Sequence, residues 1–130
     1  MEQKSSRNFD LLTLGQVLLR LSPPDNERLS RGDTFVKQVG GAELNVAVGA
    51  SLLGLHTGVI SKLPAHDIGS FMKGKIRSFG VSDDFFMYDH SPSARLGIYY
   101  YENGAYPRKP KVIYDRNNSS FFSLDINEIP

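Results

Sequence analysis

The feature that most constrains the fold is an alternation of strand-like and helix-like segments that runs through the first eighty residues. Phe9–Leu14 is a short apolar run closed by a glycine, and Thr57–Leu63 is a second such run ended by a proline. Between them, Ala42–Leu53 follows two glycines and reads as a helix, and another helix begins near Asp67. This order predicts right-handed βαβ crossovers and therefore a layered α/β fold.

The two predicted helices differ in their apolar pattern. In Ala42–Leu53 the apolar positions surround most of the cylinder, which predicts burial against a sheet. In the second helix Asp67 is the expected N-cap and Gly80 the expected C-terminal residue, whereas internal Gly69 and Gly74 weaken the prediction. Its apolar residues form a single stripe: Ile68, Phe71, Met72, Ile76 and Phe79.

From Asp84 onward the pattern changes to strands with no helix between them. Asp84–Tyr88, Arg95–Glu102 and Lys111–Arg116 are aromatic or β-branched runs separated by turn-rich stretches. We therefore expect a second, antiparallel sheet that protrudes from the first layer, with its strands in residues 17–39 and 95–116. The final residues, SLDINEIP, resemble the approach to a further helix.

Composition limits the class of protein. A chain of 130 residues with 40% apolar and 22% charged residues suits one globular domain. The formal net charge of +1 argues against a nucleic-acid or membrane-surface protein. There is no cysteine, and the three histidines are unclustered, so we expect no metal site. The polar start MEQKSSRNF predicts no signal peptide, and we expect a cytoplasmic protein.

The segment from Val39 to Ala47 is the first candidate binding element. Gly40 and Gly41 allow a sharp turn and a close approach of a ligand, and the free N–H groups of the following helix can bind oxygens. Asn45 can both donate and accept, which suits a vicinal diol. A purely structural Gly-Gly turn, with Asn45 bound to nearby backbone, is the alternative. The segment is not a P-loop, because the GxxxxGK[ST] pattern is absent.

The tyrosines of the predicted second sheet are the second candidate. By strand alternation Tyr99 and Tyr101 share one face, and Tyr100 points to the other. They could pack against the core or a partner chain, or they could form a lid over a polyol. A stacking platform for single-stranded nucleic acid, with Arg108, Lys109 and Lys111 nearby, is a third reading that the net charge disfavours.

One arginine completes the candidate site. Arg116 follows Tyr114 by two residues, so the two side chains should project from the same face of their strand. An arginine in that position can hold an anionic ligand bidentately, although a solvated surface charge is the alternative.

These motifs together resemble those of the PfkB (ribokinase-like) carbohydrate kinases. The resemblance rests on the strand ending at Gly15 and on Gly40-Gly41-Ala42-Glu43-Leu44-Asn45-Val46-Ala47 opening a helix. The stretches LRLSPP (19–24), RLGIY (95–99) and KVIYDRNNS (111–119) are similar to 2-keto-3-deoxygluconate kinases. The resemblance implies a ribokinase-like three-layer α/β core, incomplete in this chain, with a small β-sheet lid that also makes a dimer contact.

The resemblance also implies a function and a set of site residues. ATP, with Mg²⁺ bridging its phosphates, would phosphorylate a hydroxyl of 2-keto-3-deoxygluconate or a similar sugar acid. The glycine pair Gly40 and Gly41, together with Asn45, would contact the sugar, and Tyr99 would touch it from above. Tyr114 and Arg116 would hold its keto-acid end.

This chain departs from the family pattern in two places. Gly15-Gln16 replaces the usual Gly-Glu, a change that we expect to be tolerated. The GAGD-type loop of the C-terminal, ATP-binding half is absent, and in the family it supplies the anion hole and the catalytic aspartate. We therefore expect an N-terminal portion that has no catalytic residue, is inactive alone and binds neither ATP nor Mg²⁺. A non-catalytic sugar-acid-binding or dimerisation module is the alternative.

Overall fold

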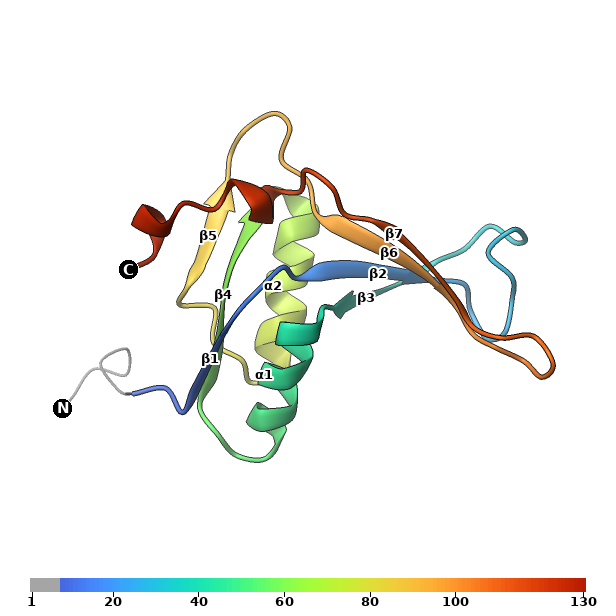
Figure 1. Ribbon diagram of the computed structural model, residues 1–130, viewed down its shortest axis with the longest axis horizontal. Helices are drawn as coiled ribbons and strands as arrows, with labels where there is room; N and C mark the ends of the chain where they lie inside the picture. Colours follow the sequence, from blue (N-terminus) through green and yellow to red (C-terminus); the bar gives the residue numbers. More distant parts are fainter. Residues whose placement is uncertain (1–7) are drawn as a thin grey trace.

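The molecule consists of two β-sheets and two α-helices. The computed structural model describes residues 8–130, so most of the N-terminal segment for which we expected no signal peptide lies outside the described residues. One sheet forms a core with two helices, and the other extends away from it as a long arm, which we call the lid (Figure 1). No helix among the residues described is long and apolar enough to cross a membrane.

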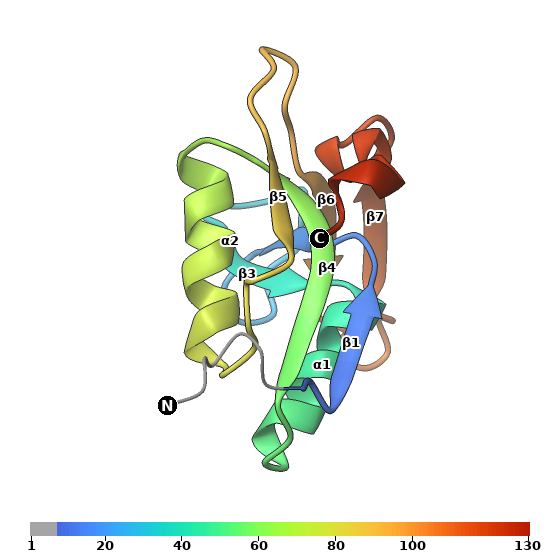
Figure 2. The same ribbon diagram turned by 90° about the vertical axis from the view of Figure 1, so that its left-hand side faces the viewer.

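The core sheet is parallel and has helices on one face. Its strands are β1 (Leu11–Leu14), β4 (Thr57–Pro64) and β5 (Phe86–Asp89), in the order β1-β4-β5. Helices α1 (Ala42–Leu52) and α2 (Asp67–Ser78) both lie on the side of this sheet that faces the lid (Figures 1 and 2). The predicted alternation of strands and helices is confirmed.

The hydrophobic core lies between these helices and β4. Its best-buried side chains come from one face of each element: Leu44 and Ala47 of α1, Val59 and Leu63 of β4, and Met72 and Ile76 of α2. The apolar stripe predicted for α2 is confirmed, because Ile68, Phe71 and Phe79 pack against the same cluster.

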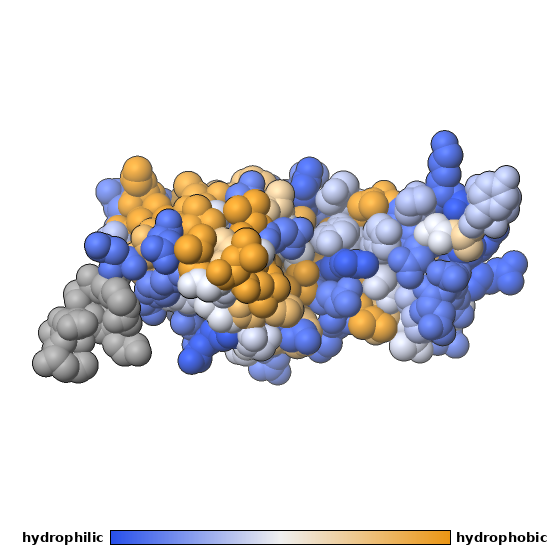
Figure 3. All heavy atoms as spheres, turned by 90° about the horizontal axis from the view of Figure 1, so that it is seen from below, coloured by the Kyte–Doolittle hydropathy of each residue, from blue (hydrophilic) through white to orange (hydrophobic). Residues whose placement is uncertain are grey.

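The predicted packing of α1 against a sheet is confirmed, but it involves only one side of the helix. Only Leu44 and Ala47 are buried, whereas Val46 and Leu52 are 56% and 71% exposed. The helix packs one side on β1 and β4, and within residues 8–130 no element covers its opposite side. Figure 3 shows the resulting apolar area on the core end of the molecule, beside a lid end that is mainly hydrophilic.

The lid is a four-stranded mixed sheet. Its strands are β2 (Leu18–Ser22), β3 (Val36–Gly40), β6 (Gly97–Glu102) and β7 (Lys111–Asp115), in the order β3-β2-β6-β7. The two outer pairs are antiparallel, but β2 and β6 are parallel, so the prediction of a wholly antiparallel sheet is wrong. The reason is that both strands leave the core and run toward the lid tip (Figure 1).

A second correction concerns the strand predicted at Asp84–Tyr88. The sequence pattern predicts that this strand joins the protruding sheet. In the structure it is β5, which pairs in parallel with β4 and buries Phe86 in the core. The change of pattern at Asp84 marks the end of the helices and not the start of the second sheet. The sheet that a strand joins depends on a long-range pairing that its own residues do not encode.

Two local predictions also need correction. The N-cap of α2 is His66 and not Asp67, since His66 Nδ1 accepts from the Ile68 N–H at 3.2 Å. Asp67 lies in the first turn, where an acidic side chain interacts favourably with the helix dipole. The chain end forms two 3₁₀ turns, η1 (Ser120–Ser123) and η2 (Ile126–Glu128), in place of a longer helix approach.

Candidate functional site

A hollow of about 260 Å³ lies between the start of α1 and the inner face of the lid. We call it the lid hollow, and it is lined by Leu18, Gly41, Ala42, Asn45, Tyr99, Tyr114 and Arg116. The structure therefore brings together five of the six residues predicted from the sequence, which come from α1 and its preceding turn, β6, and the end of β7.

Gly41 is held in a conformation that suits only glycine. Its φ of +118° lies in the region that residues with a side chain rarely adopt, and a Cβ would stand 2.7 Å from the Gln16 carbonyl oxygen. The helix has no side-chain cap. The N–H groups of its first turn, which have no partner within the helix, therefore open toward the lid hollow beside Ala42.

Gly40, the remaining predicted site residue, does not line the lid hollow. It is buried at the end of β3, and a Cβ there would come within 2.5 Å of the Tyr99 hydroxyl oxygen. Gly40 therefore makes room for the Tyr99 ring, and its contact with the hollow is indirect.

The tyrosines and the arginine form one continuous surface on the lid. Tyr99 and Tyr114 are register partners across β6 and β7, with ring centroids 5.8 Å apart. The Arg116 guanidinium carbon lies 4.3 Å from the Tyr114 ring centroid, which confirms that these two side chains share a face. Stacking on the ring holds the guanidinium plane while leaving its N–H groups available for an anion.

Gly97 contributes to the lid hollow although sequence reasoning gave it no role. A Cβ on Gly97 would lie 2.9 Å from the Arg116 Cβ and 2.8 Å from a methyl group of Leu18. The one sequence signal for this close approach is the position of a glycine at the start of a strand. Leu18 and Ala42 were also missed, because ordinary apolar residues carry no signal of a site.

The charge of the lid hollow is positive. Among residues 8–130, Arg116 is its only ionisable group apart from the two tyrosines, and no Asp, Glu or His of that range lines it. The neighbouring Asp115 is engaged elsewhere, because Arg95 Nη2 lies 3.2 Å from its carboxylate and 2.7 Å from its carbonyl oxygen. A small molecule with an anionic end and several hydroxyl groups matches this lining.

The segment that follows β7 is hydrogen-bonded to other parts of the chain. Gln16, at the position where the family usually has glutamate, donates from Nε2 to the Ser119 hydroxyl. Ser120 is buried and donates to Asp89 at 2.7 Å, and this bond holds the pKa of the Asp89 carboxyl below its usual range. The segment after β7 is thus tied to the core.

Comparisons with known proteins agree with this geometry. The sequence pattern of the pfkB family of carbohydrate kinases matches residues 8–128. A 2-dehydro-3-deoxygalactonokinase of Haloferax volcanii is 40% identical over 92% of this chain and 37% of its own length. The crystal structure of 2-dehydro-3-deoxygluconokinase from Thermotoga maritima superposes with a TM-score of 0.86 at 38% identity, over 92% of this chain and 36% of that one.

A more distant solved structure supports the fold alone. An uncharacterized sugar kinase of Pyrococcus horikoshii, solved in complex with ATP, has a TM-score of 0.79 at 24% identity, over 92% of this chain and 38% of that one. The chain thus spans a little over a third of the length of the relatives that it matches.

Proposed function

The chain belongs to the pfkB family of carbohydrate kinases, and we propose that its lid hollow binds the acceptor of a kinase for 2-keto-3-deoxygluconate or a similar sugar acid. The observation that carries the proposal is the lining of the lid hollow. A helix start and an arginine face one space, and no carboxylate of the described residues lines it. Two of the relatives named above support it by name, since they are a 2-dehydro-3-deoxygalactonokinase and a 2-dehydro-3-deoxygluconokinase.

Each group of the lining has a part in this binding. Arg116, held on the Tyr114 ring, pairs with the carboxylate of the acid, and the Tyr114 hydroxyl group donates to the same end. Asn45 and the N–H groups at the start of α1 bind hydroxyl groups along the chain of the sugar. Tyr99 covers the ligand from the lid and excludes water.

We further propose that these 130 residues bind the acceptor without phosphorylating it. ATP, when bound, supplies the phosphoryl group, and a base must take the proton of the attacking hydroxyl. In the part of the chain that the structure describes, no Asp, Glu or His lines the lid hollow and could do so. Within residues 8–130 no group of three acidic, histidine or cysteine side chains could hold a metal ion. A binding module without catalysis is therefore the second candidate.

Titration calorimetry with a matched pair of ligands tests the acceptor site. The pair is 2-keto-3-deoxygluconate and 3-deoxyfructose, in which a neutral hydroxymethyl group replaces the carboxylate. The acid should bind about 10- to 150-fold more tightly, because hydrogen bonds to charged groups contribute about 1.5–3 kcal/mol. Arg116→Met should remove this preference, whereas Arg77→Met, on the exposed face of α2, should retain it.

Two outcomes would contradict the proposal. The first is equal affinity of the unchanged protein for both ligands, and the second is a preference for the acid that survives Arg116→Met. Release of ADP from ATP in the presence of the acid, measured with these 130 residues alone, would instead contradict the absence of catalysis.

We also propose that the protein self-associates through the lid. Val36, Val112 and Ile113 are 43–48% exposed on its strands. Sedimentation of Val112→Asp should then show a smaller species than the unchanged protein does, and equal sedimentation would contradict this contact. The cytoplasmic location stays a prediction.

A further inference from the structure

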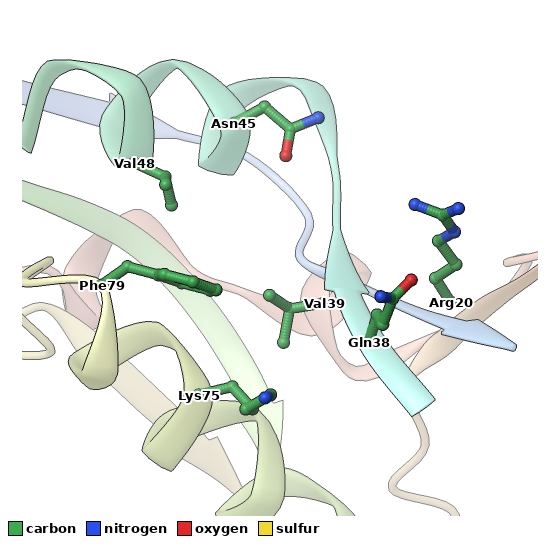
Figure 4. Close-up of a pocket in the computed structure, with 7 residues that line it drawn as sticks. All are labelled: Arg20, Gln38, Val39, Asn45, Val48, Lys75 and Phe79. Atoms are coloured by element: carbon green, nitrogen blue, oxygen red, sulfur yellow. The ribbon is translucent and has the colours of Figure 1, made fainter. Parts of the chain in front are cut away.

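Within residues 8–130, Arg116 is the one basic side chain that lines the lid hollow. A second hollow, of about 230 Å³, surrounds the edge strand β3, and Figure 4 shows Arg20 and Lys75 on opposite sides of that strand. The Arg20 guanidinium carbon lies 4.6 Å from the centroid of the Tyr101 ring. The attraction of the lid hollow for an acid therefore depends on Arg116 and on the groups beside it.

Gln16 is one of these groups. It lies in the connection between β1 and β2, where the chain leaves the core for the lid. Its Nε2 atom is 2.5 Å from the point that a Cβ on Gly97 would occupy, and the Arg116 Cβ is 2.9 Å from the same point. A methyl group of Leu18, which lines the lid hollow, is 2.8 Å from it. The Gln16 amide thus lies next to the base of the Arg116 side chain.

A hydrogen bond holds the Gln16 side chain in this place. Its Nε2 atom donates to the hydroxyl of Ser119, a residue that is only 4% exposed and follows Arg116 by three positions. An amide makes this link without adding a charge. A carboxylate of the same shape could accept from the Ser119 hydroxyl, but it would bring a negative charge close to Arg116.

The absence of a charge at Gln16 affects what Arg116 can bind. A carboxylate beside a guanidinium pairs with it and competes with the carboxylate of a ligand. Asp115 does not act in this way, because its Oδ1 atom lies 3.2 Å from Arg95 Nη2. In the part of the chain that the structure describes, Arg116 forms no ion pair.

We propose that Gln16 is a positioning residue that sets the preference of the lid hollow for an acid. Its uncharged amide holds the segment after β7 and leaves the Arg116 charge available to the carboxylate of the ligand. This inference rests on the acceptor site proposed above, because it concerns how that site distinguishes an acid from a neutral sugar. Gln16 acts through Arg116 and does not line the lid hollow itself.

Gln16→Glu tests the proposal, because it keeps the shape of the side chain and adds the charge. Calorimetric titration at pH 7 should show an affinity for 2-keto-3-deoxygluconate that is about three- to fivefold lower, the effect of an exposed ion pair. The affinity for the neutral 3-deoxyfructose should stay unchanged. Gln16→Met, which removes the hydrogen bond but adds no charge, should retain the preference for the acid. Thr34→Glu is the control, since it adds the same charge at an exposed lid position outside the lid hollow.

A measurement without ligand separates this inference from the acceptor site. The pKa of the carboxyl group introduced by Gln16→Glu can be followed by NMR, with and without the additional change Arg116→Met. The charged groups around this position are Arg116 from the lid and Glu43 from α1, whose carboxylate lies against Gly15. Removing Arg116 should raise the pKa by about 0.5, because the carboxylate loses a neighbouring cation while Glu43 stays in place.

Three results would overturn the proposal. They are an unchanged preference for the acid in Gln16→Glu, a pKa that does not respond to Arg116→Met, and the same loss of preference in Gln16→Met as in Gln16→Glu. The first of these would leave the acceptor site intact, since the unchanged protein would still prefer the acid. Equal affinity of the unchanged protein for both ligands would instead overturn the acceptor site and this specificity together.

Discussion

The core and the lid are built from the same chain but differ in what their inner faces present. In the core, the facing side chains of α1, α2 and β4 are apolar and almost wholly buried. In the lid, the inner face carries Tyr99, Tyr114 and Arg116 around a space, and β7 is exposed along its whole length. The comparison teaches that the core provides stability, whereas the lid leaves its polar and aromatic groups available for a ligand.

The two regions are also held together differently. The core relies on packing, but the lid tip depends on polar contacts around Glu102, which is only 4% exposed. Its carboxylate accepts from the Leu29 N–H at 2.8 Å and lies 3.6 Å from Arg108, and the bond to Leu29 is the main reason that the pKa of Glu102 lies below its usual range. A hydrogen bond and an ion pair, more than apolar burial, hold the two loops of the tip together.

The largest expected effect comes from opening the core. Leu63→Ala should lower the free energy of unfolding by about 2–5 kcal/mol, because Leu63 is fully buried and a cavity would remain. Lys109→Ala at the lid tip, where the side chain is exposed, should change it by less than about 0.5 kcal/mol. Urea unfolding of both variants measures the difference, and similar losses would erase the distinction between the two regions.

The next effect is expected at the joint between core and lid. Gly41→Ala should lose about 1–3 kcal/mol of stability, because its positive φ and the nearby Gln16 carbonyl oxygen oppose a Cβ. Gly74→Ala is the control, since a Cβ there meets nothing within 4 Å on an exposed part of α2. It should gain up to about 1 kcal/mol. Equal thermal shifts in the two variants would show that Gly41 is not conformationally required.

A smaller effect should separate binding from stability within the lid. Tyr114→Phe removes only a hydroxyl group from a side chain that is 56% exposed, so the melting temperature should stay unchanged. Affinity for 2-keto-3-deoxygluconate should fall about fivefold, the loss of one hydrogen bond. A variant that melts at a lower temperature but binds as before would assign Tyr114 to packing.

The smallest effect is a dependence of stability on acid. Hydrogen bonds hold the pKa of Glu128 below its usual range, first that from the Asp125 N–H and then that from Lys62, and Asp89 behaves similarly through Ser120. A carboxyl whose pKa is lower in the folded state stabilises the fold above its unfolded pKa, and this stabilisation is lost as the pH falls through the folded value. Thermal stability should therefore decline below about pH 4.5.

Glu128→Gln provides the control for this titration. The variant should start less stable at neutral pH, because Lys62 loses the carboxylate that lies 2.9 Å away, and its stability should then decline less in acid. A parallel decline in both proteins would show that Glu128 does not contribute to the pH dependence.

Local patterns in the sequence were sufficient for much of the fold and part of the site. The stripe on α2, the turn at Gly41 and the shared face of Tyr114 and Arg116 each depend on residues close together in the chain, where helix and strand periods apply. The family resemblance then predicted that these pieces surround one sugar. The close contact of Gly40 with Tyr99 could not be predicted in this way, because it depends on packing between two strands.

Other features depend on pairings that no local pattern encodes. The membership of β5 in the core sheet and the parallel pairing of β2 with β6 join segments more than twenty residues apart. The lid hollow likewise includes Leu18 and Ala42, which come from separate elements. Each looks like an ordinary apolar residue until the fold brings the two together.

A crystal structure of the protein with 2-keto-3-deoxygluconate tests the central claim most directly. We predict density for the acid inside the lid hollow, with its carboxylate on Arg116 and Tyr114 and its hydroxyl groups toward Asn45 and the start of α1. Density for the acid elsewhere, with Arg116 and Gly41 making no contact to it, would contradict the account.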